Sequence, residues 1–138
     1  MGMHRSTKTY GHNLGLSCAF RQWRASSHCR FVHGYAIQVS FEFAAEELDY
    51  RNWVVDFGGM KPMKKWLEET FDHKTLVAED DPELDWFEMA HRRGMIDMVR
   101  VPAVGCEKFA EMIFKKCEED RKSTRLNSSH EWISRMPS

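Results

Sequence analysis

Residues 35–43 alternate apolar and polar side chains without interruption, and this pattern constrains the fold more than any other. The apolar members of the alternation are Tyr35, Ile37, Val39, Phe41 and Phe43. A period of two is typical of a β-strand with one buried face. The chain is therefore expected to build a sheet that is covered on one side. Similar, less regular patterns predict an earlier strand over residues 7–23 and a short strand over residues 53–57.

Helical spacing follows these strands. Apolar residues recur at helical spacing in residues 61–70 and again in residues 106–117. Between them, a third helix is expected to begin at Asp81, which serves as its N-cap, and to end at Gly94. The apolar residues 95–101 favour one further strand. This order predicts an α+β domain with helices on one face of a mostly antiparallel sheet.

Composition narrows the class of protein. A chain of 138 residues with 42% hydrophobic content can bury one core, so a single domain is expected. Neither a membrane span nor a signal peptide is evident, and we expect a cytoplasmic protein. The 4 cysteines lack a C-x-x-C spacing, which argues for reduced thiols and against a four-cysteine zinc site. No basic stripe accompanies the net charge of −1, so nucleic acid is not an expected partner.

The last part of the chain differs from the rest. From Asp120 onward the apolar periodicity stops and the composition becomes that of polar coil. The stretch from Asp120 to His130 resembles, without a mismatch, the translation of a common sequencing-library adapter, and residues 134–138 resemble a second block of it. An ordinary flexible tail is the alternative. We expect a native domain over residues 1–119 and a non-native tail over residues 120–138, with a terminal strand missing.

Cys29 and His33 are the first candidates for chemistry. Cys29 follows two serines in an expected loop and has His28 beside it. It is interpreted as a reactive thiol, with a buried structural cysteine as the alternative. His33 precedes Gly34, where it can be a metal ligand or a turn histidine.

Two acidic positions complete the candidates. Asp72 and His73 follow the first helix, where the carboxylate can orient and charge-stabilise an imidazole or simply cap the helix. Glu107 stands in the expected first turn of the last helix, a place that the helix dipole alone favours for a carboxylate. At these positions a catalytic role and a helix-capping role can be distinguished only with the help of other sequence motifs.

Four blocks together resemble the 6-pyruvoyl-tetrahydropterin synthase and 6-carboxytetrahydropterin synthase family. Residues 29–35 resemble its Cys-x-x-x-His-Gly-His, and residues 53–61 resemble Trp-(Ile/Val)-(Ile/Val)-Asp-Phe-x-x-(Leu/Met)-Lys. Residues 71–73 stand where the family has Leu-Asp-His, and residues 104–107 where it has Pro-Thr-x-Glu. The blocks fall in the family's order and cover most of the chain before the adapter-like tail.

The resemblance implies the tunnelling fold, a four-stranded antiparallel sheet with two helices on one face. Subunits of such proteins join their sheets into barrels and stack into hexamers, with active sites at subunit interfaces. It also implies a lyase for dihydroneopterin triphosphate that feeds pterin, deazapurine or queuosine synthesis. By resemblance, Cys29 is the general base, His33 a zinc ligand, Asp72 and His73 a proton-transfer pair, and Glu107 a residue near the pterin.

The zinc site departs from the family pattern. Phe20 and Tyr35 stand at the positions of the other two histidine ligands, and a phenyl ring offers no lone pair to a metal. We therefore hypothesise that Arg24 and Tyr35 bind substrate in place of the metal, one through positive charge and the other as a hydrogen-bond donor. A non-catalytic or zinc-independent pterin-binding protein is the main alternative. A Cys-His hydrolase is a weaker one, because no oxyanion-hole motif accompanies Cys29.

Overall fold

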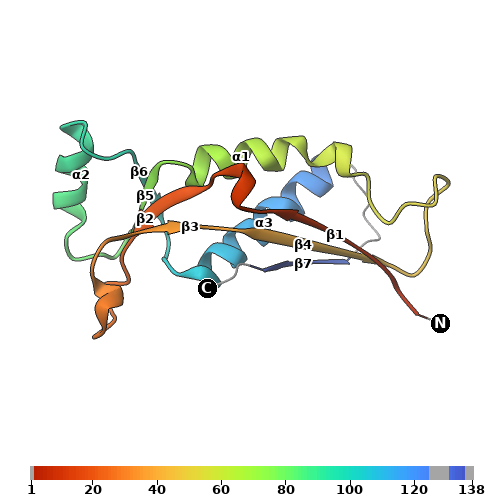
Figure 1. The fold of residues 1–138 in the computed structure, drawn as a ribbon, viewed down its shortest axis with the longest axis horizontal. Coiled ribbons are helices and arrows are strands. Elements are labelled where there is room, and N and C mark those ends of the chain that lie inside the picture. Colours follow the sequence, from red (N-terminus) through yellow and green to blue (C-terminus); the bar gives the residue numbers. More distant parts are fainter. Residues whose placement is uncertain (1, 125–130, 136–138) are drawn as a thin grey trace.

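The computed structural model describes residues 2–124 and 131–135 of the chain. The helices of this part are α1 (Lys61–Phe71), α2 (Leu84–Arg92) and α3 (Cys106–Thr124), with short 3-10 turns η1 (His12–Leu14), η2 (His28–Arg30) and η3 (Phe57–Met60). The strands are β1 (His4–Tyr10), β2 (Ser17–Phe20), β3 (His33–Ala36), β4 (Val39–Ala45), β5 (Lys74–Ala78), β6 (Met98–Val101) and β7 (Glu131–Arg135). Figure 1 shows their arrangement in an elongated molecule.

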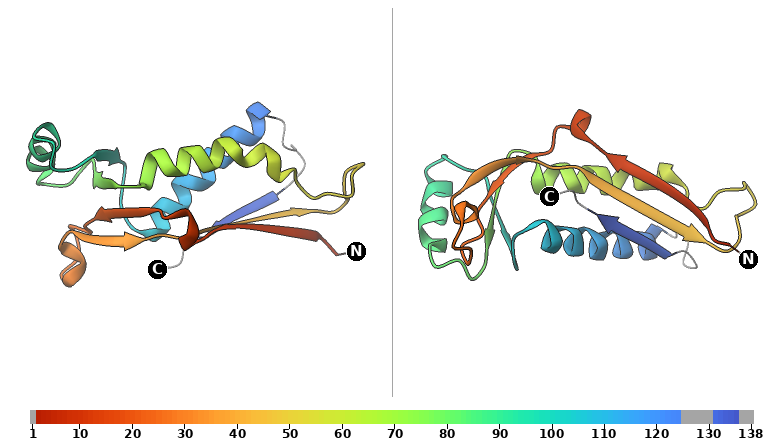
Figure 2. Two further views of the ribbon diagram at one scale, coloured as in Figure 1. Left: turned by 45° about the horizontal axis from the view of Figure 1, so that its top comes forward. Right: turned by 60° about the horizontal axis from the view of Figure 1, so that its bottom comes forward.

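The described strands form two sheets. One is antiparallel throughout and has the order β1-β4-β7, and the other has the order β3-β2-β5-β6. In the second sheet β2 runs antiparallel to β3 but parallel to β5, which is parallel to β6. Helices α1 and α3 cover one face of the antiparallel sheet, while α2 lies beyond the far end of β5 and β6 (Figure 2). The α+β class, with an antiparallel sheet and helices on one face, is confirmed.

The core lies between α1, α3 and the inward face of β4. Each element contributes side chains at its own period, every fourth residue from a helix and every second from the strand. The fully buried members are Met63, Leu67 and Phe71 of α1, Phe109, Ile113 and Cys117 of α3, and Val39, Phe41 and Phe43 of β4. The predicted helices over residues 61–70 and 106–117 are thus confirmed, because apolar spacing at this period can be buried only on one side of a helix.

The two long predicted strands each divide in two. Residues 7–23 form β1 and β2, separated by η1 and by Gly15, whose φ of 71° is left-handed. Residues 35–43 form the end of β3 and most of β4, with a break at Ile37 and Gln38. The alternation of side chains continues through both breaks because it reports which side is buried, whereas membership of a sheet depends on distant hydrogen-bond partners.

The predicted strand over residues 53–57 is wrong. This segment is a turn region before η3, held by the Asp49 carboxylate, which accepts the N–H of Trp53 at 3.0 Å. Val54 and Val55 are both buried although they are neighbours, which a half-exposed strand does not permit. The turn geometry therefore overrides the strand propensity of these residues.

Strand β5 was missed. Its residues 75–78 are all buried, as expected for a strand that lies between β2 and β6 in a parallel arrangement. Helix α2 begins at Leu84, later than predicted, because the Asp81 carboxylate accepts the N–H of Glu83 in a preceding turn. The helix ends before Gly94, which has a φ of 75°, as predicted.

The expectation of a missing terminal strand is also wrong for this structure. Helix α3 continues through Asp120 to Thr124, and β7 pairs with β4 from Ala44 to Ser40. Strand β4 has β1 on one side, so a strand on its other side pairs backbone groups that would otherwise lack partners. The adapter-like origin of residues 120–138 stays a prediction, and residues 125–130 and 136–138 lie outside the described part. No helix of the described residues is long and apolar enough to cross a membrane.

Candidate active site

The short ribbon of β2 and β3 brings four predicted or neighbouring site positions onto one face. Its antiparallel register places Cys18 opposite Tyr35 and Phe20 opposite His33. Directly opposed residues share a face of a sheet, and residues two apart along a strand do so as well. Cys18 and Phe20 are buried, while Tyr35 and His33 are partly exposed at the edge.

Three of these side chains form a ring stack, defined here as Phe20, Tyr35 and His33. The rings of Phe20 and Tyr35 lie 4.1 Å apart between centroids at an interplanar angle of 15°. The imidazole of His33 stacks on Tyr35 at 5.5 Å and 11°. Phe109 of α3 meets Phe20 edge-on at 4.9 Å, which anchors the stack to the core. The structure thus brings together the three positions that correspond, by family resemblance, to the metal ligands.

Cys29 lies in η2, immediately before β3, with its side chain partly exposed. Its N–H donates to the hydroxyl of Ser27 at 3.3 Å, and its carbonyl accepts the N–H of Gln22 at 2.8 Å. Burial raises the pKa of the Tyr35 hydroxyl, and negative charge on Cys29 acts in the same direction. Cys29 thus stands in the loop that leads into β3, the strand that carries Tyr35 and His33.

The N-terminus of α3 meets the same site. Gly105 has a φ of 121°, and a Cβ placed there would lie 3.6 Å from Oε1 of Gln22 and 3.8 Å from Oε2 of Glu107. Burial raises the pKa of Cys106, and the Glu107 carboxylate adds to that shift. Negative charge on Cys106 acts to raise the pKa of Tyr35 as well. The predicted Glu107 follows Cys106 at the start of α3, where its side chain is exposed.

Cys106 is a site residue that the sequence analysis did not select. It stands within residues 104–107, where only the carboxylate was considered. The available signal was a thiol in the first turn of a helix, a position where backbone N–H groups point outward. Its interaction with Cys18 becomes visible only when α3 packs against the β2–β3 ribbon.

Asp72 and His73 form a pair at the other end of β2. Oδ1 of Asp72 lies 2.9 Å from Nδ1 of His73 and accepts the N–H of Ser17 at 3.4 Å. The backbone N–H of His73 donates to the carbonyl of Ser17 at 2.6 Å, and its φ is 60°. Ser17 precedes Phe20 by three residues, which is about 10 Å along a strand. One chain therefore forms the pair but does not bring it to Cys29.

The imidazole of His73 faces outward. Its side chain is 85% exposed, whereas that of Asp72 is 31% exposed. The pair is consequently accessible to another molecule, and Asp72 acts at the same time as the C-cap of α1.

Arg24 lies in the turn that follows β2 and has its own partner. Its guanidinium is 2.7 Å from a carboxylate oxygen of Asp80 and stacks over Trp23 at 4.3 Å. The Arg24 hydrogen bond lowers the pKa of Asp80 below its ordinary value. Arg24 and Trp23 border a cavity of about 510 Å³ that Gln22 and Lys108 also line. The Arg24 guanidinium thus lies near the start of α3, at a cavity that none of the three stacked rings lines.

The residues at the three ligand positions do not fit zinc. Zinc takes three or four nitrogen, sulfur or carboxylate ligands, and the stack offers one imidazole and one neutral phenol. Nδ1 of His33 already lies 2.6 Å from the carbonyl of Phe31, which leaves Nε2 alone for a ligand. Among the described residues, no group of three or more His, Cys, Asp or Glu side chains is arranged to hold a metal ion.

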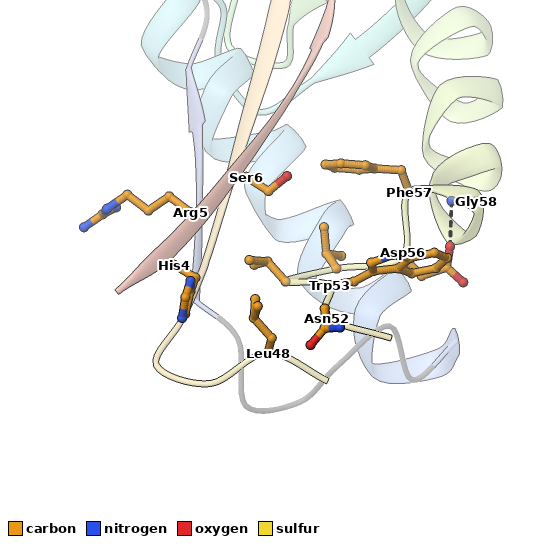
Figure 3. Close-up of a pocket in the computed structure, with 11 residues that line it drawn as sticks. His4, Arg5, Ser6, Leu48, Asn52, Trp53, Asp56, Phe57 and Gly58 are labelled. Carbon is orange, nitrogen blue, oxygen red and sulfur yellow. Dashed lines mark hydrogen bonds between the residues drawn. The ribbon is translucent and has the colours of Figure 1, made fainter. Parts of the chain in front are cut away.

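A second cavity, of about 590 Å³, lies at the opposite end of the molecule (Figure 3). It is bounded by the start of β1 and the turn region before α1, including Arg5, Trp53 and Asp56. Asp56 uses its carboxylate to accept the N–H of Gly58 at 2.9 Å, so it serves as a cap. The block of residues 53–61 therefore organises the entry to α1, and none of the predicted site residues lines this cavity.

Comparison with known proteins agrees with the fold and the motifs. A family model described as 6-pyruvoyl tetrahydropterin synthase matches residues 12–136. The 6-carboxy-5,6,7,8-tetrahydropterin synthases of Rickettsia conorii and Rickettsia felis are each 39% identical over 57 residues, which is 41% of this chain and 41% of theirs. The match therefore spans less than half the length of these curated relatives.

Two solved structures share the fold. An uncharacterized protein from Wolinella succinogenes has a TM-score of 0.76 at 16% identity, covering 99% of this chain and 98% of its own. The Plasmodium falciparum 6-pyruvoyl tetrahydropterin synthase has a TM-score of 0.65 at 15% identity, covering 98% of each chain. Because the family model spans nearly all of the described fold, the chain belongs to the 6-pyruvoyl tetrahydropterin synthase family.

Proposed function

We propose that this chain is a lyase of pterin biosynthesis that acts on dihydroneopterin triphosphate, as a 6-carboxytetrahydropterin synthase-like enzyme. The observation that carries the proposal is the ring stack at the edge of the β2–β3 ribbon, with Cys29 in the loop that leads into β3. The stack offers a partly exposed aromatic surface suited to a planar ring, and Phe109 of α3 packs against it.

Cys29 is proposed as the general base. Its backbone is held on both sides by Ser27 and Gln22, while its side chain keeps partial access to solvent. A thiolate there takes a proton from a C–H bond of the substrate side chain and becomes a thiol. Tyr35 donates a hydrogen bond to the neighbouring side-chain oxygen, which acidifies that C–H bond. Its raised pKa supports this role because a protonated phenol is a donor.

Glu107 and Arg24 are proposed to bind the two ends of the substrate. A carboxylate accepts paired hydrogen bonds from the guanidine-like edge of a pterin, and Glu107 is exposed at the start of α3. Arg24 and Lys108 supply positive charge to the cavity of about 510 Å³ next to it. That charge suits the triphosphate, although the substrate has to compete with Asp80 for the guanidinium.

Asp72 and His73 are proposed to complete a site on a second copy of the chain. Their exposed pair bonds to Ser17 at the start of β2, whereas Cys29 bonds to Gln22 beyond the end of that strand, so the pair serves its own Cys29 poorly. A homo-oligomer with sites at subunit interfaces, a hexamer by family resemblance, would use the pair for proton transfer. We propose that this assembly works in the cytoplasm, in the deazapurine or queuosine branch of pterin use.

A non-catalytic or zinc-independent pterin-binding protein is the second candidate. The loss of two imidazoles at the ring stack favours it, because binding of a planar ring needs the stack but no proton transfer. Both candidates predict pterin binding, and only the first predicts turnover.

The test compares wild type with Cys29→Ala and with Ser26→Ala, an exposed position in the same loop as a matched control. Each protein is incubated with dihydroneopterin triphosphate, and the products are identified by mass spectrometry. We expect turnover by wild type and the control, and a loss of at least about 100-fold in Cys29→Ala. Binding without turnover in all three favours the second candidate. Absence of both binding and turnover contradicts the whole proposal.

A further inference from the structure

We infer that the ring stack is a metal site converted to an aromatic one: wild type does not hold zinc there, and imidazoles at positions 20 and 35 create a zinc site with His33. The inference concerns the metal and not the reaction, so it does not depend on the proposed function. It rests on the register of β2 and β3, on the orientation of His33 and on the chemistry of the other side chains.

The backbone already presents three converging positions. Phe20 and His33 are direct partners in the ladder, and Tyr35 is the next residue on the same face of β3. Direct partners have Cβ atoms about 4.5–5.5 Å apart, and diagonal neighbours lie within reach of aromatic side chains. The short distance of 4.1 Å between the Phe20 and Tyr35 rings shows that the diagonal pair does converge. Imidazoles at positions 20 and 35 that are turned out of the parallel stack toward His33 can therefore reach one ion at Zn–N distances of about 2.0–2.1 Å.

His33 keeps the orientation of a metal ligand. Its Nδ1 lies 2.6 Å from the carbonyl oxygen of Phe31, which leaves Nε2 as the ring nitrogen for a ligand, and the ring lies nearly parallel to that of Tyr35. Metal-binding histidines commonly donate the other ring nitrogen to a backbone carbonyl, which fixes the tautomer. The backbone of β3 thus orients one ligand, while the other two positions carry aromatic side chains.

The remaining side chains do not replace the missing imidazoles. Phe20 is 2% exposed and fills the space beside Tyr35 with carbon. Cys18 lies opposite Tyr35 on the same face but is buried at 4% exposure. Among the described residues, no three His, Cys, Asp or Glu side chains are grouped so that they could hold a metal ion.

The experiment compares wild type with Phe20→His/Tyr35→His and with the same double variant carrying His33→Ala. Each protein is loaded with Zn²⁺, dialysed and assayed for metal content, and its affinity is measured by competition with a chromogenic chelator. We expect about 0.1 equivalent of Zn²⁺ per chain or less in wild type, and about one equivalent per chain in the double variant. The affinity gain should exceed about 100-fold, since loss of a supporting partner alone costs 10–100-fold. Adding His33→Ala should remove most of that gain.

Folding is checked separately because Phe20 is part of the core. Circular dichroism monitors each variant, and Tyr35→His alone, which leaves Phe20 in place, serves if the double variant fails to fold. With two imidazoles it should bind Zn²⁺ more tightly than wild type, and Co²⁺ absorption should report the new nitrogen ligands. Wild type that retains one equivalent of zinc, lost in His33→Ala, overturns the inference. So does a folded double variant, or a folded Tyr35→His, that binds no better than wild type.

Discussion

The ion pair between Arg21 and Asp81 allows a quantitative test of how much a buried charge pair stabilises the segment that follows β2. Arg21 directly follows β2, and its guanidinium donates to both oxygens of Asp81 at 2.9 and 2.5 Å. The Asp81 side chain is 2% exposed and that of Arg21 is 22% exposed. Burial acts to raise the pKa of Asp81, but the Arg21 hydrogen bonds and the N–H of Glu83 outweigh it and hold that pKa below its ordinary value.

The perturbation is Arg21→Met, which keeps an unbranched apolar stem and leaves a buried carboxylate without its cation. Breaking a buried pair costs about 3–5 kcal/mol, and the partial exposure of Arg21 reduces the expected loss here to about 2–3 kcal/mol. The double variant Arg21→Met/Asp81→Asn removes the unpaired charge and keeps an oxygen for the N–H of Glu83. It should recover stability to within about 1 kcal/mol of wild type. Arg93→Met, at an exposed position, is the control and should change stability by less than about 0.5 kcal/mol.

Urea unfolding at pH 7 and pH 4 measures the effect and its sign. In wild type the lowered pKa of Asp81 contributes stability above the unfolded pKa of about 3.9, and that contribution is lost as pH falls through the folded pKa. In Arg21→Met, burial still acts to raise the pKa of Asp81, and the N–H of Glu83 opposes it without the help of Arg21. Protonation of Asp81 at pH 4 therefore lowers the cost of the unpaired carboxylate in the variant. The difference in unfolding free energy should therefore shrink at pH 4. A loss below about 0.5 kcal/mol at pH 7, or one that is equal at both pH values, refutes the reasoning.

Two further predictions concern the core and a turn. Phe109→Ala removes a ring that is fully buried against Phe20 and Phe71, and it should lower the unfolding free energy by about 3–5 kcal/mol. A loss of less than about 2 kcal/mol, measured by urea titration, would contradict this packing. Gly94→Ala should cost about 1–2 kcal/mol because its φ is 75°, although a Cβ there meets no neighbour within 4 Å. Gly2→Ala, which also meets nothing, is its matched control, and equal melting temperatures for the two variants would argue against backbone strain.

The candidate site was only partly accessible to sequence reasoning. Short motifs identify Cys29 and His33 because both lie in one continuous segment, whose loop and strand are local structures. Cys106 was missed because its significance depends on the packing of α3 against the ribbon. The partner of Arg24 also depends on a distant residue, Asp80, which follows β5. Contacts between segments far apart in the chain carry no local pattern, so residue spacing does not reveal them.

The sequence by itself determined the helices α1 and α3, the buried face of β4 and the family, because each depends on side-chain period or on the order of motifs. Only the tertiary structure decided where the long alternating stretches pass from one sheet to the other and that β5 lies between β2 and β6. It also decided that one chain separates His73 from Cys29. The physical reason is that period depends on which side of a segment is buried, whereas sheet order and site geometry depend on hydrogen bonds and packing between distant segments.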